Sequence, residues 1–512
     1  MVGTRFVEEL LSADTAEHFE VTVLGAEQYE PYNRVLLSEV LAGRSDIASL
    51  QLPVRQDARV RVYRGLTATD VDRERRLVTT DDGTRHPYDV LVLATGARAH
   101  VPDLPGLTGE RPAGAYVLRS VDDCRDVVAA TVNARRAVVV GGGLLGLEAA
   151  VGLLQRGLAV TLVHHRDYLL DRQLDASAAA VLAAAADDLG LEVLLGSKPA
   201  AVSTRAGRVS GVRLDDDRWA AADVLLLACG TRPETELAAA AGLSTDRGVL
   251  VTDQLRSPDD DRVAGLGDCA QPPEGGSGLV AQGWEQARRL ARSLVEEAAG
   301  RGAAGRALVP DAGRVPEPGR APETGPVPAP GLGEVVRLKA KGLDVVTMGS
   351  PDVPGARTVT LDDPDGRRHL RVSVRDDRLV GAICVGAGDL AADLVAAYDR
   401  GTPLPLDPAA LLIRSMAAPP VEASPTMLPS RATVCRCNGV TKGDIVQAWE
   451  EGAGTVAEVA ACTRATTGCG GCRGAVEGIL AWLADGEPDR SAAAPGPAAA
   501  APRKRTEAPA VR

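Results

Sequence analysis

The chain has 512 residues, of which 45% are hydrophobic and 25% charged, and its formal net charge at pH 7 is −12. This composition is typical of a soluble globular protein, and the length predicts several domains. The acidic balance argues against nucleic-acid binding, and no apolar run approaches the roughly 20 residues that a membrane-spanning helix needs. No secretory signal opens the chain, so it is expected in the cytoplasm, where thiols stay reduced.

The first residues predict a helix from Thr4 and then a strand that ends before Glu27. An acid at that place can bind a ribose. Met1-Val2-Gly3 is interpreted as the end of a GxGxxG loop whose first half lies upstream, which makes Gly3 a candidate dinucleotide contact. We therefore expect a mis-chosen start codon or a truncated chain, and the alternative is an ordinary N-terminal helix.

Short runs rich in Val, Leu and Ala recur along the first half of the chain, as buried parallel strands do. They lie at 20–26, 89–95, 137–141, 159–163 and 223–229. Helices are expected at 144–156 and 173–189, between or after these runs. This alternation predicts an α/β doubly wound architecture.

The strand at 137–141 leads directly into Gly141-x-Gly143-x-x-Gly146 and a helix. In that context the glycines let the backbone and the helix N-terminus approach a pyrophosphate. About twenty residues further on, where an acid would bind the ribose of NADH, stands His164, the first residue of a His-His-Arg run. Without a carboxylate at this position NADPH can also bind, so the choice between NADH and NADPH is left open.

Three later signals complete a second dinucleotide site. The strand at 89–94 ends in Thr95 and Gly96, and residues 222–233 repeat this pattern of a strand and a small-residue turn. Asp268 follows another short strand, in a position suited to a flavin ribityl hydroxyl. The order of these signals predicts two nested dinucleotide domains, the second inserted into the first.

The remaining chain predicts smaller parts. Residues 334–384 contain short alternating runs and turns, which indicate a small antiparallel sheet. Three stretches rich in Pro, Gly or Ala, at 300–333, 401–430 and 485–512, predict two linkers and a disordered tail.

Four of the nine cysteines form two tight pairs near the C-terminus, Cys435 with Cys437 and Cys469 with Cys472. Four thiolates at this spacing can hold one metal centre, either a structural zinc or a [2Fe-2S] cluster. Capping boxes at 441–444 and 455–458 predict short helices between the pairs, and the second pair is expected at the start of a third helix. The rest of the chain is suited to handling electrons, which favours iron–sulfur.

By these features the chain resembles the FAD-dependent pyridine-nucleotide oxidoreductases, in the branch of NAD(P)H nitrite reductase large subunits and assimilatory nitrate reductase electron-transfer subunits. The matching strings are YNRVLLSEVLAG (32–43), ATGARAHVPDLPG (94–106), GGGLLGLEAA (141–150), DRQLD (171–175), GTRP (230–233) and GDCA (267–270). VCRCNGVTKGDI (434–445) and TRATTGCGGC (463–472) resemble the bacterioferritin-associated-ferredoxin-like (BFD-like) [2Fe-2S] module of that branch.

The resemblance implies two nested Rossmann-like dinucleotide-binding domains, a small α+β reductase domain and a small helical [2Fe-2S] domain. The expected boundaries are 1–115 and 241–299 for FAD, 116–240 for NAD(P)H, 334–400 for the α+β domain and 431–484 for the cluster. The implied FAD contacts are Glu27, Arg34, Thr95, Gly96 and Asp268, and the implied NAD(P)H contacts are Gly141, Gly143, Gly146 and Glu148.

The expected activity is that of a cytoplasmic NAD(P)H-dependent flavoprotein, which passes electrons through FAD and the [2Fe-2S] cluster to a separate nitrate or nitrite reductase. The alternatives are a ferredoxin- or rubredoxin-type reductase for an oxygenase, an amine oxidase subunit and a non-enzymatic iron–sulfur regulatory module. The other five cysteines are expected to be buried small hydrophobes. They form no quartet for a [4Fe-4S] centre, so we do not expect this chain to reduce nitrite itself. The oligomeric state is left open.

Overall fold

The computed structural model describes residues 1–54, 56–304, 335–401, 403, 428–435, 438–468 and 470–486. The chain divides into a large unit, Met1–Val421 with Thr467–Cys469, and a small unit, Glu422–Thr466 with Gly470–Arg512. Within the described ranges, no helix is both long enough and apolar enough to cross a membrane.

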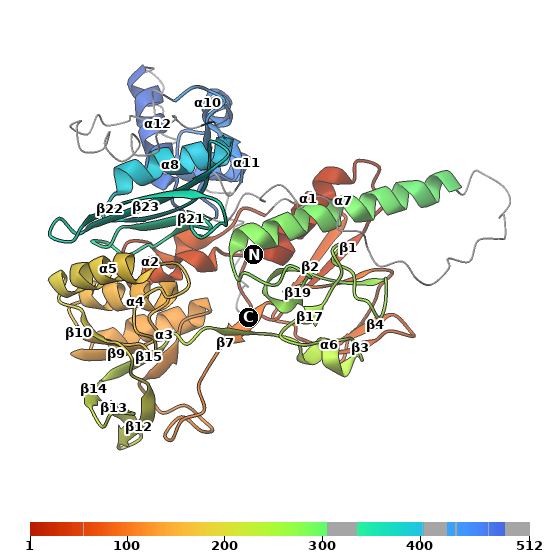
Figure 1. Ribbon diagram of the computed structural model, residues 1–512. Coiled ribbons are helices and arrows are strands. Elements are labelled where there is room, and N and C mark those ends of the chain that lie inside the picture. The colour runs from red at the N-terminus through yellow and green to blue at the C-terminus, as the bar shows by residue number, and fades with distance from the viewer. Residues whose placement is uncertain are drawn as a thin grey trace, which may run out of the picture. The chain divides into compact units, whose positions relative to one another are not determined.

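A five-stranded parallel sheet forms the inner domain of the large unit (Figure 1). Its strands, in spatial order, are β11 (Glu192–Leu194), β10 (Ala159–Val163), β9 (Arg136–Val140), β15 (Val224–Leu227) and β8 (Ala115–Val117). Its helices are α3 (Val121–Thr131), α4 (Leu144–Gln155) and α5 (Ala176–Asp188). All four residues of β15 are buried, as expected for a central parallel strand covered on both faces.

The outer domain is built from two pairs of parallel strands, β1 (Val21–Gly25) with β2 (Val60–Arg64) and β6 (Leu91–Leu93) with β18 (Val263–Gly265). α1 (Val2–Ala13) packs along α7 (Val280–Ala304), where Phe6 and Leu10 share one apolar cluster with Leu290 (Figure 1). α7 includes the first five residues of the expected linker, 300–304, and the rest of that linker, 305–333, lies outside the described residues.

The chain returns to the outer domain at two places after the inner sheet. β16 (Thr231–Pro233) pairs with β7 (Ala97–Ala99), and β18 pairs with β6. The inner domain is thus inserted between paired strands of the outer one, and the expectation of a nested α/β architecture is confirmed.

Smaller elements complete these two domains, and two antiparallel sheets among them were not expected. The first contains β3 (Ala68–Asp72), β4 (Leu77–Thr80) and β5 (Arg85–Pro87), and the second β12 (Pro199–Arg205), β13 (Arg208–Leu214) and β14 (Trp219–Ala221). The short remaining elements are α2 (Leu37–Leu41), α6 (Glu236–Ala240), β17 (Val249–Leu250) and β19 (Ala270–Gln271).

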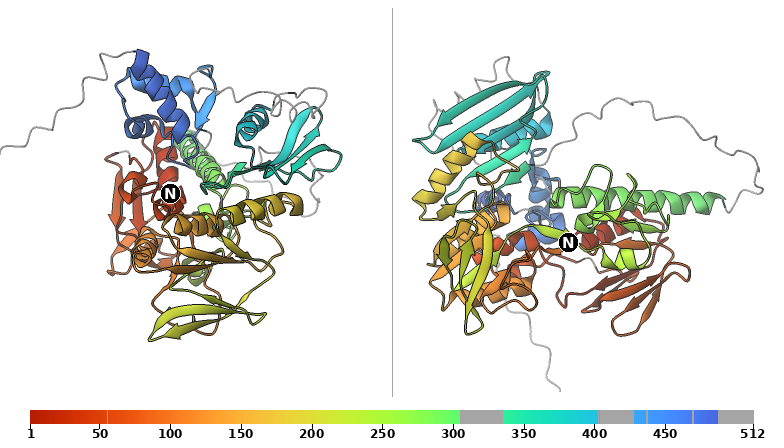
Figure 2. Two further views of the ribbon diagram at one scale, coloured as in Figure 1. Left: turned by 90° about the vertical axis from the view of Figure 1, so that its left-hand side faces the viewer. Right: turned by 60° about the horizontal axis from the view of Figure 1, so that its bottom comes forward.

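The antiparallel sheet expected at 334–384 is confirmed. Its order is β20 (Val335–Arg337), β21 (Val345–Gly349), β24 (Arg378–Val385), β23 (Arg368–Arg375) and β22 (Arg357–Asp363). Figure 2 shows α8 (Gly388–Arg400) against this sheet, and α5 contacts its other face. Successive side chains of a strand point to opposite faces, so Cys384 joins the cluster under α8 while Ile383 and Val385 join the core of the inner domain.

The small unit contains a two-stranded sheet and three helices. They are β25 (Thr433–Cys435), β26 (Val440–Thr441), α10 (Lys442–Glu450), α11 (Val456–Thr463) and α12 (Arg473–Gly486). Both expected capping boxes are confirmed, because Thr441 with Asp444 and Thr455 with Glu458 exchange their hydrogen bonds. The core is apolar and includes Ile445, Val459 and Ile479, each fully buried.

One carboxylate both starts a helix and joins two domains. Asp175 caps α5 by accepting a hydrogen bond from the Ala178 N–H (2.9 Å), and its other oxygen pairs with Arg371 of β23 (3.1 Å). Burial raises the pKa of the Asp175 carboxyl, but these hydrogen bonds outweigh it and leave the pKa below its ordinary value. The stabilisation is therefore complete at neutral pH and is lost as the pH falls through the lowered pKa.

Two substitutions of Asp175 distinguish the stability that comes from the helix cap from the stability that comes from the ion pair. Asp175→Ala removes both interactions and is expected to cost about 1–2 kcal/mol. Asp175→Asn keeps a capping oxygen and loses only the charge, so it should cost about half as much. Thermal unfolding of both variants at pH 7 measures the difference. Equal losses would contradict a role for Asp175 as a cap.

Candidate functional site

The glycine loop after β9 is closed on its protein side and open on the other. Gly141 has φ +118°, and a Cβ on it would lie 2.2 Å from the carbonyl oxygen of Ala228. A Cβ on Gly146 would lie 1.8 Å from the Gly141 oxygen, whereas one on Gly143 would meet no atom within 4 Å. Since α4 begins at Leu144, directly after Gly143, the open side presents a helix N-terminus. These glycines therefore fit a dinucleotide pyrophosphate.

His164 lies at the end of β10 and supports this loop. The residue is 4% exposed, and its Nδ1 accepts the Gly142 N–H at 3.1 Å. Nδ1 is therefore unprotonated, and Nε2 carries the proton 3.3 Å from Asp171 Oδ1. Burial lowers the pKa of His164, which favours this neutral ring. A Cβ on Gly142 would lie 2.7 Å from the His164 ring, so the imidazole fills the space beside the loop.

The residues after His164 are open to solvent. His165 and Arg166 are exposed, and the Arg166 Nε lies 3.7 Å from Asp171 Oδ2. Asp171 therefore lies between the buried imidazole and the exposed guanidinium. Asp171 lies in the string DRQLD (171–175), but the sequence analysis assigned it no role, because it stands seven residues beyond His164 and reaches the imidazole only through the fold.

Glu148 of α4 is buried, and both of its carboxylate oxygens accept hydrogen bonds. Its Oε2 accepts the Ser38 hydroxyl at 2.6 Å, and its Oε1 accepts both the Lys339 ammonium (2.8 Å) and the Lys339 N–H (3.0 Å). Its carboxylate thus joins α2 of the outer domain, α4 of the inner domain and the start of the α+β domain. Lys339 is 191 residues from Glu148, so local sequence patterns could not reveal this pair.

The residues expected at the flavin converge on the start of α1. Arg34 pairs with Glu27 at 2.7 Å, and Arg119 pairs with Asp268 at 2.6 Å. All four charges act on the amino group of Met1, whose pKa is lowered to about 6 by burial and by Arg34. Glu27, Arg34 and Asp268 are therefore brought together, and Arg119 is an additional member that the sequence analysis missed.

Gly3 packs in the outer domain as Gly146 does in the inner one. Gly3 lies in the first turn of α1, and a Cβ added to it would lie 3.2 Å from the Ala94 Cβ. A Cβ added to Gly146 would lie at the same distance from the Ala228 Cβ. In both halves the alanine ends a strand and a small-residue turn follows. In the outer half that turn holds Thr95, whose hydroxyl donates to the Glu234 carbonyl (2.9 Å), and Gly96 at φ +74°.

Two of the four predicted cluster ligands are described, and they lie together in the small unit. The other two, Cys437 and Cys469, lie outside the described residues. A hydrogen bond from the Cys472 thiol, with backbone donors at Asn438 and Thr466, lowers the pKa of Cys435 to about 6 against the opposing effect of burial. Cys472 directly precedes α12. An acidified Cys435 sulfur beside a second thiol that directly precedes a helix fits two of the thiolate ligands of an iron–sulfur cluster.

The other cysteines mostly follow expectation. Cys124, Cys269 and Cys384 are buried and Cys229 is partly buried. Burial raises the pKa of Cys124 and Cys229 to about 11 and that of Cys384 to about 12, which makes them unreactive. Cys462 is exposed on α11, so the expectation that all five are buried is wrong for this residue.

Comparison with known families identifies both parts of the chain. The profile of the pyridine nucleotide-disulphide oxidoreductases matches residues 3–289, and that of the BFD-like [2Fe-2S] binding domain matches residues 433–482. Nitrite reductase [NAD(P)H] of Bacillus subtilis (strain 168) is 31% identical over 498 residues, which are 96% of this chain and 58% of that protein. The assimilatory nitrate reductase electron transfer subunit of the same strain is 30% identical over 502 residues, 97% of this chain and 60% of that protein.

Solved structures share the fold of the large unit. The ferredoxin reductase for the CYP199A2 system from Rhodopseudomonas palustris superposes with a TM-score of 0.62 at 22% identity, covering 81% of this chain and 97% of that one. Putidaredoxin reductase in its covalent complex with putidaredoxin gives 0.65 at 21% identity, with the same coverage of 81% and 97%. The chain spans about three fifths of the length of the two Bacillus relatives. It belongs to the pyridine nucleotide-disulphide oxidoreductase family, whose domain implies FAD and NAD(P)H as cofactors, and its BFD-like domain implies a [2Fe-2S] cluster.

Proposed function

We propose that the chain is a cytoplasmic electron-transfer enzyme, which oxidises NAD(P)H and delivers the electrons to a separate nitrate or nitrite reductase protein. The observation that carries this proposal is the presence, in one chain, of two dinucleotide-binding domains and the paired thiols Cys435 and Cys472. The names of the two Bacillus relatives support a nitrate or nitrite reductase as the acceptor. In such a chain FAD takes up an electron pair as hydride, and the cluster carries electrons one at a time.

The protein's part in this scheme is to bind and orient. The amides of the loop from Gly141 to Gly146 hold the pyrophosphate of NAD(P)H, and His164 fixes the loop from behind. Arg34 and Arg119 orient the carboxylates of Glu27 and Asp268. Carboxylate oxygens accept more than one hydrogen bond, so both acids can also accept hydroxyl groups of FAD. The scheme requires no general acid or base from the chain.

A reductase serving an oxygenase is the alternative with specific support. The ferredoxin reductase component of chlorobenzene dioxygenase from Cupriavidus sp. (strain PS12) is 36% identical over 267 residues, which are 50% of this chain and 63% of that protein. That match covers only half of this chain, whereas the Bacillus relatives match nearly all of it. A built-in cluster domain is better suited to direct delivery to a reductase, which we therefore prefer.

The glycine loop provides the first test. Gly146→Ala forces a methyl group to within 1.8 Å of the Gly141 oxygen, so the loop must shift. We expect a loss of stability of about 1–3 kcal/mol and a KM for NAD(P)H raised at least tenfold. Gly143→Ala meets no protein atom but enters the space for the pyrophosphate, so it should raise the KM with no loss of thermal stability. If Gly143→Ala leaves the KM unchanged, the pyrophosphate is not bound at this loop.

Coenzyme preference is tested at the end of β10. Arg166→Ala removes the exposed guanidinium that can pair with a 2′-phosphate, so we expect kcat/KM for NADPH to fall about tenfold relative to that for NADH. Arg172→Ala, another exposed arginine of the same segment, is the control and should leave the ratio unchanged. Equal effects of the two substitutions would contradict the assignment of Arg166.

Changing His164 has a different consequence. His164→Glu places a second carboxylate beside Asp171 and breaks the support of the Gly142 N–H, so kcat/KM should fall for both coenzymes. His164→Glu with Asp171→Asn removes the repulsion and should shift the ratio toward NADH, since a carboxylate accepts the 2′-hydroxyl and repels the 2′-phosphate. A shift to NADH in the single variant alone would contradict the supporting role of His164.

The route through the cluster is tested by Cys472→Ser. Iron content and the visible absorbance of the cluster should be lost, while NAD(P)H-dependent ferricyanide reduction persists in the FAD-loaded protein, because ferricyanide takes electrons directly from flavin. Reduction of a purified nitrate or nitrite reductase should fall at least a hundredfold. Cys462→Ser, an exposed thiol outside the two pairs, should behave as the unaltered chain. Full reductase turnover without the cluster would overturn the route.

A further inference from the structure

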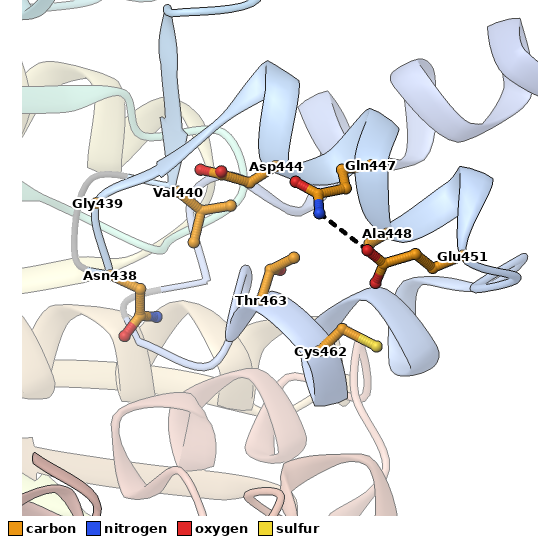
Figure 3. Close-up of a pocket in the computed structure, with 9 residues that line it drawn as sticks. All are labelled: Asn438, Gly439, Val440, Asp444, Gln447, Ala448, Glu451, Cys462 and Thr463. Carbon is orange, nitrogen blue, oxygen red and sulfur yellow. Dashed lines mark hydrogen bonds between the residues drawn. The ribbon is translucent and has the colours of Figure 1, made fainter. Parts of the chain in front are cut away.

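A pocket in the small unit opens between its first two helices. Its volume is about 320 Å³, and its lining comes from the turn at 438–440, from α10 and from α11. Figure 3 shows Asp444, Gln447 and Glu451 on one side and Cys462 with Thr463 on the other. Val440 and Ala448 are buried and form the apolar part of the lining.

One residue of the pocket touches a predicted cluster ligand. The Asn438 amide nitrogen lies 3.6 Å from the Cys435 sulfur and 2.5 Å from the Arg464 carbonyl oxygen. The backbone N–H of Asn438 also donates to the same sulfur. The wall of the pocket is thus a single side chain away from the sulfur atom that would hold the metal. A protein bound in the pocket would lie next to the redox centre, so the distance for electron transfer would be short.

The charge of the pocket indicates which side chains a protein bound there would present. Its lining contains two carboxylates, Asp444 and Glu451, and no lysine or arginine. Asp444 accepts only the capping bonds of Thr441, and Glu451 accepts the Gln447 amide, so in the described part of the chain neither has a cationic partner. A lysine side chain combines an apolar stem with a cationic end, and therefore matches an apolar base below two carboxylates.

We propose that this pocket is the docking site for the electron acceptor, a separate protein that carries a one-electron centre and presents lysine or arginine side chains around it. A cluster held by the paired cysteines would supply one electron, and the acceptor's centre would gain it, with no bond made and no proton moved. The inference rests on the proposed function and adds to it the surface where electrons leave and the charge of the partner.

The test uses the full-length protein with its cluster and cytochrome c as the probe, because cytochrome c is basic and accepts one electron. Asp444→Asn with Glu451→Gln removes both charges while keeping the hydrogen-bonding shapes. We expect the Kd for cytochrome c at low ionic strength to rise five- to tenfold, with a weaker dependence on salt. Glu477→Gln, an exposed acid of α12 outside the pocket, is the control and should leave the Kd unchanged.

A second variant tests shape instead of charge. Cys462→Phe fills the pocket and should also raise the Kd, whereas Cys462→Ser should not. The iron content and visible absorbance of every variant check that the domain is folded. The rate at which NAD(P)H reduces the cluster inside the chain is measured by stopped-flow absorbance and should be the same in all of them.

Three outcomes would overturn the proposal. The first is an unchanged Kd in both pocket variants, and the second is no binding of cytochrome c by the unaltered chain. The third is slower reduction of the cluster by NAD(P)H in the pocket variants, which would assign the pocket to the flavin-bearing part of the same chain. If NAD(P)H does not reduce the cluster even in the unaltered chain, the proposed function itself fails, whatever the pocket binds.

Discussion

Both nucleotide-binding halves depend on one close contact between a helix and a strand. In the inner half Gly146 of α4 sits on Ala228, and in the outer half Gly3 of α1 sits on Ala94, each with a Cβ distance of 3.2 Å. A Cβ at either glycine would be unusually tight against this alanine, so the helix and the strand would have to separate by a few tenths of an ångström. The helix N-terminus would then move away from the position in which its amides can face a phosphate. Two sites of different function thus rest on the same steric condition.

The domains of the large unit are held together by buried or partly buried charges whose partners lie far apart in the sequence. Glu148 receives hydrogen bonds from Ser38 and Lys339, so one carboxylate connects three parts of the chain. Asp175 likewise connects two elements, α5 of the inner domain and β23 of the α+β domain. A buried carboxylate that lost its cation would be costly. These pairs therefore favour one arrangement of the α+β domain on the inner domain.

The sequence predicted the fold where the signal is local. The parallel strands β1, β6, β9, β10 and β15 were found from their continuous apolar runs, whereas the parallel strands β2, β8 and β11 were missed. The two capping boxes of the small unit were found from residues three apart. The antiparallel strands β12 to β14 were missed, although turns at Ala206–Gly207 and at 215–217 mark their ends. Arg119, Lys339 and Asp171 could not be found, because each acquires its partner only through tertiary structure. His164 was correctly placed at the end of its strand, but its burial against Gly142 depends on the loop conformation.

The nested topology also has a consequence for the order in which the chain can fold during synthesis. The inner domain has its strands within residues 115–227, so it can form its sheet as soon as that stretch has left the ribosome. β6 cannot pair until β18 has been synthesised, and α1 cannot pack until α7, which ends at Ala304, has been synthesised. Domains generally fold as units as they emerge, and pairings distant in sequence form late. The pyridine-nucleotide half is therefore complete while the flavin half still exposes the apolar face of α1, and that interval is when the nascent chain is most exposed to aggregation.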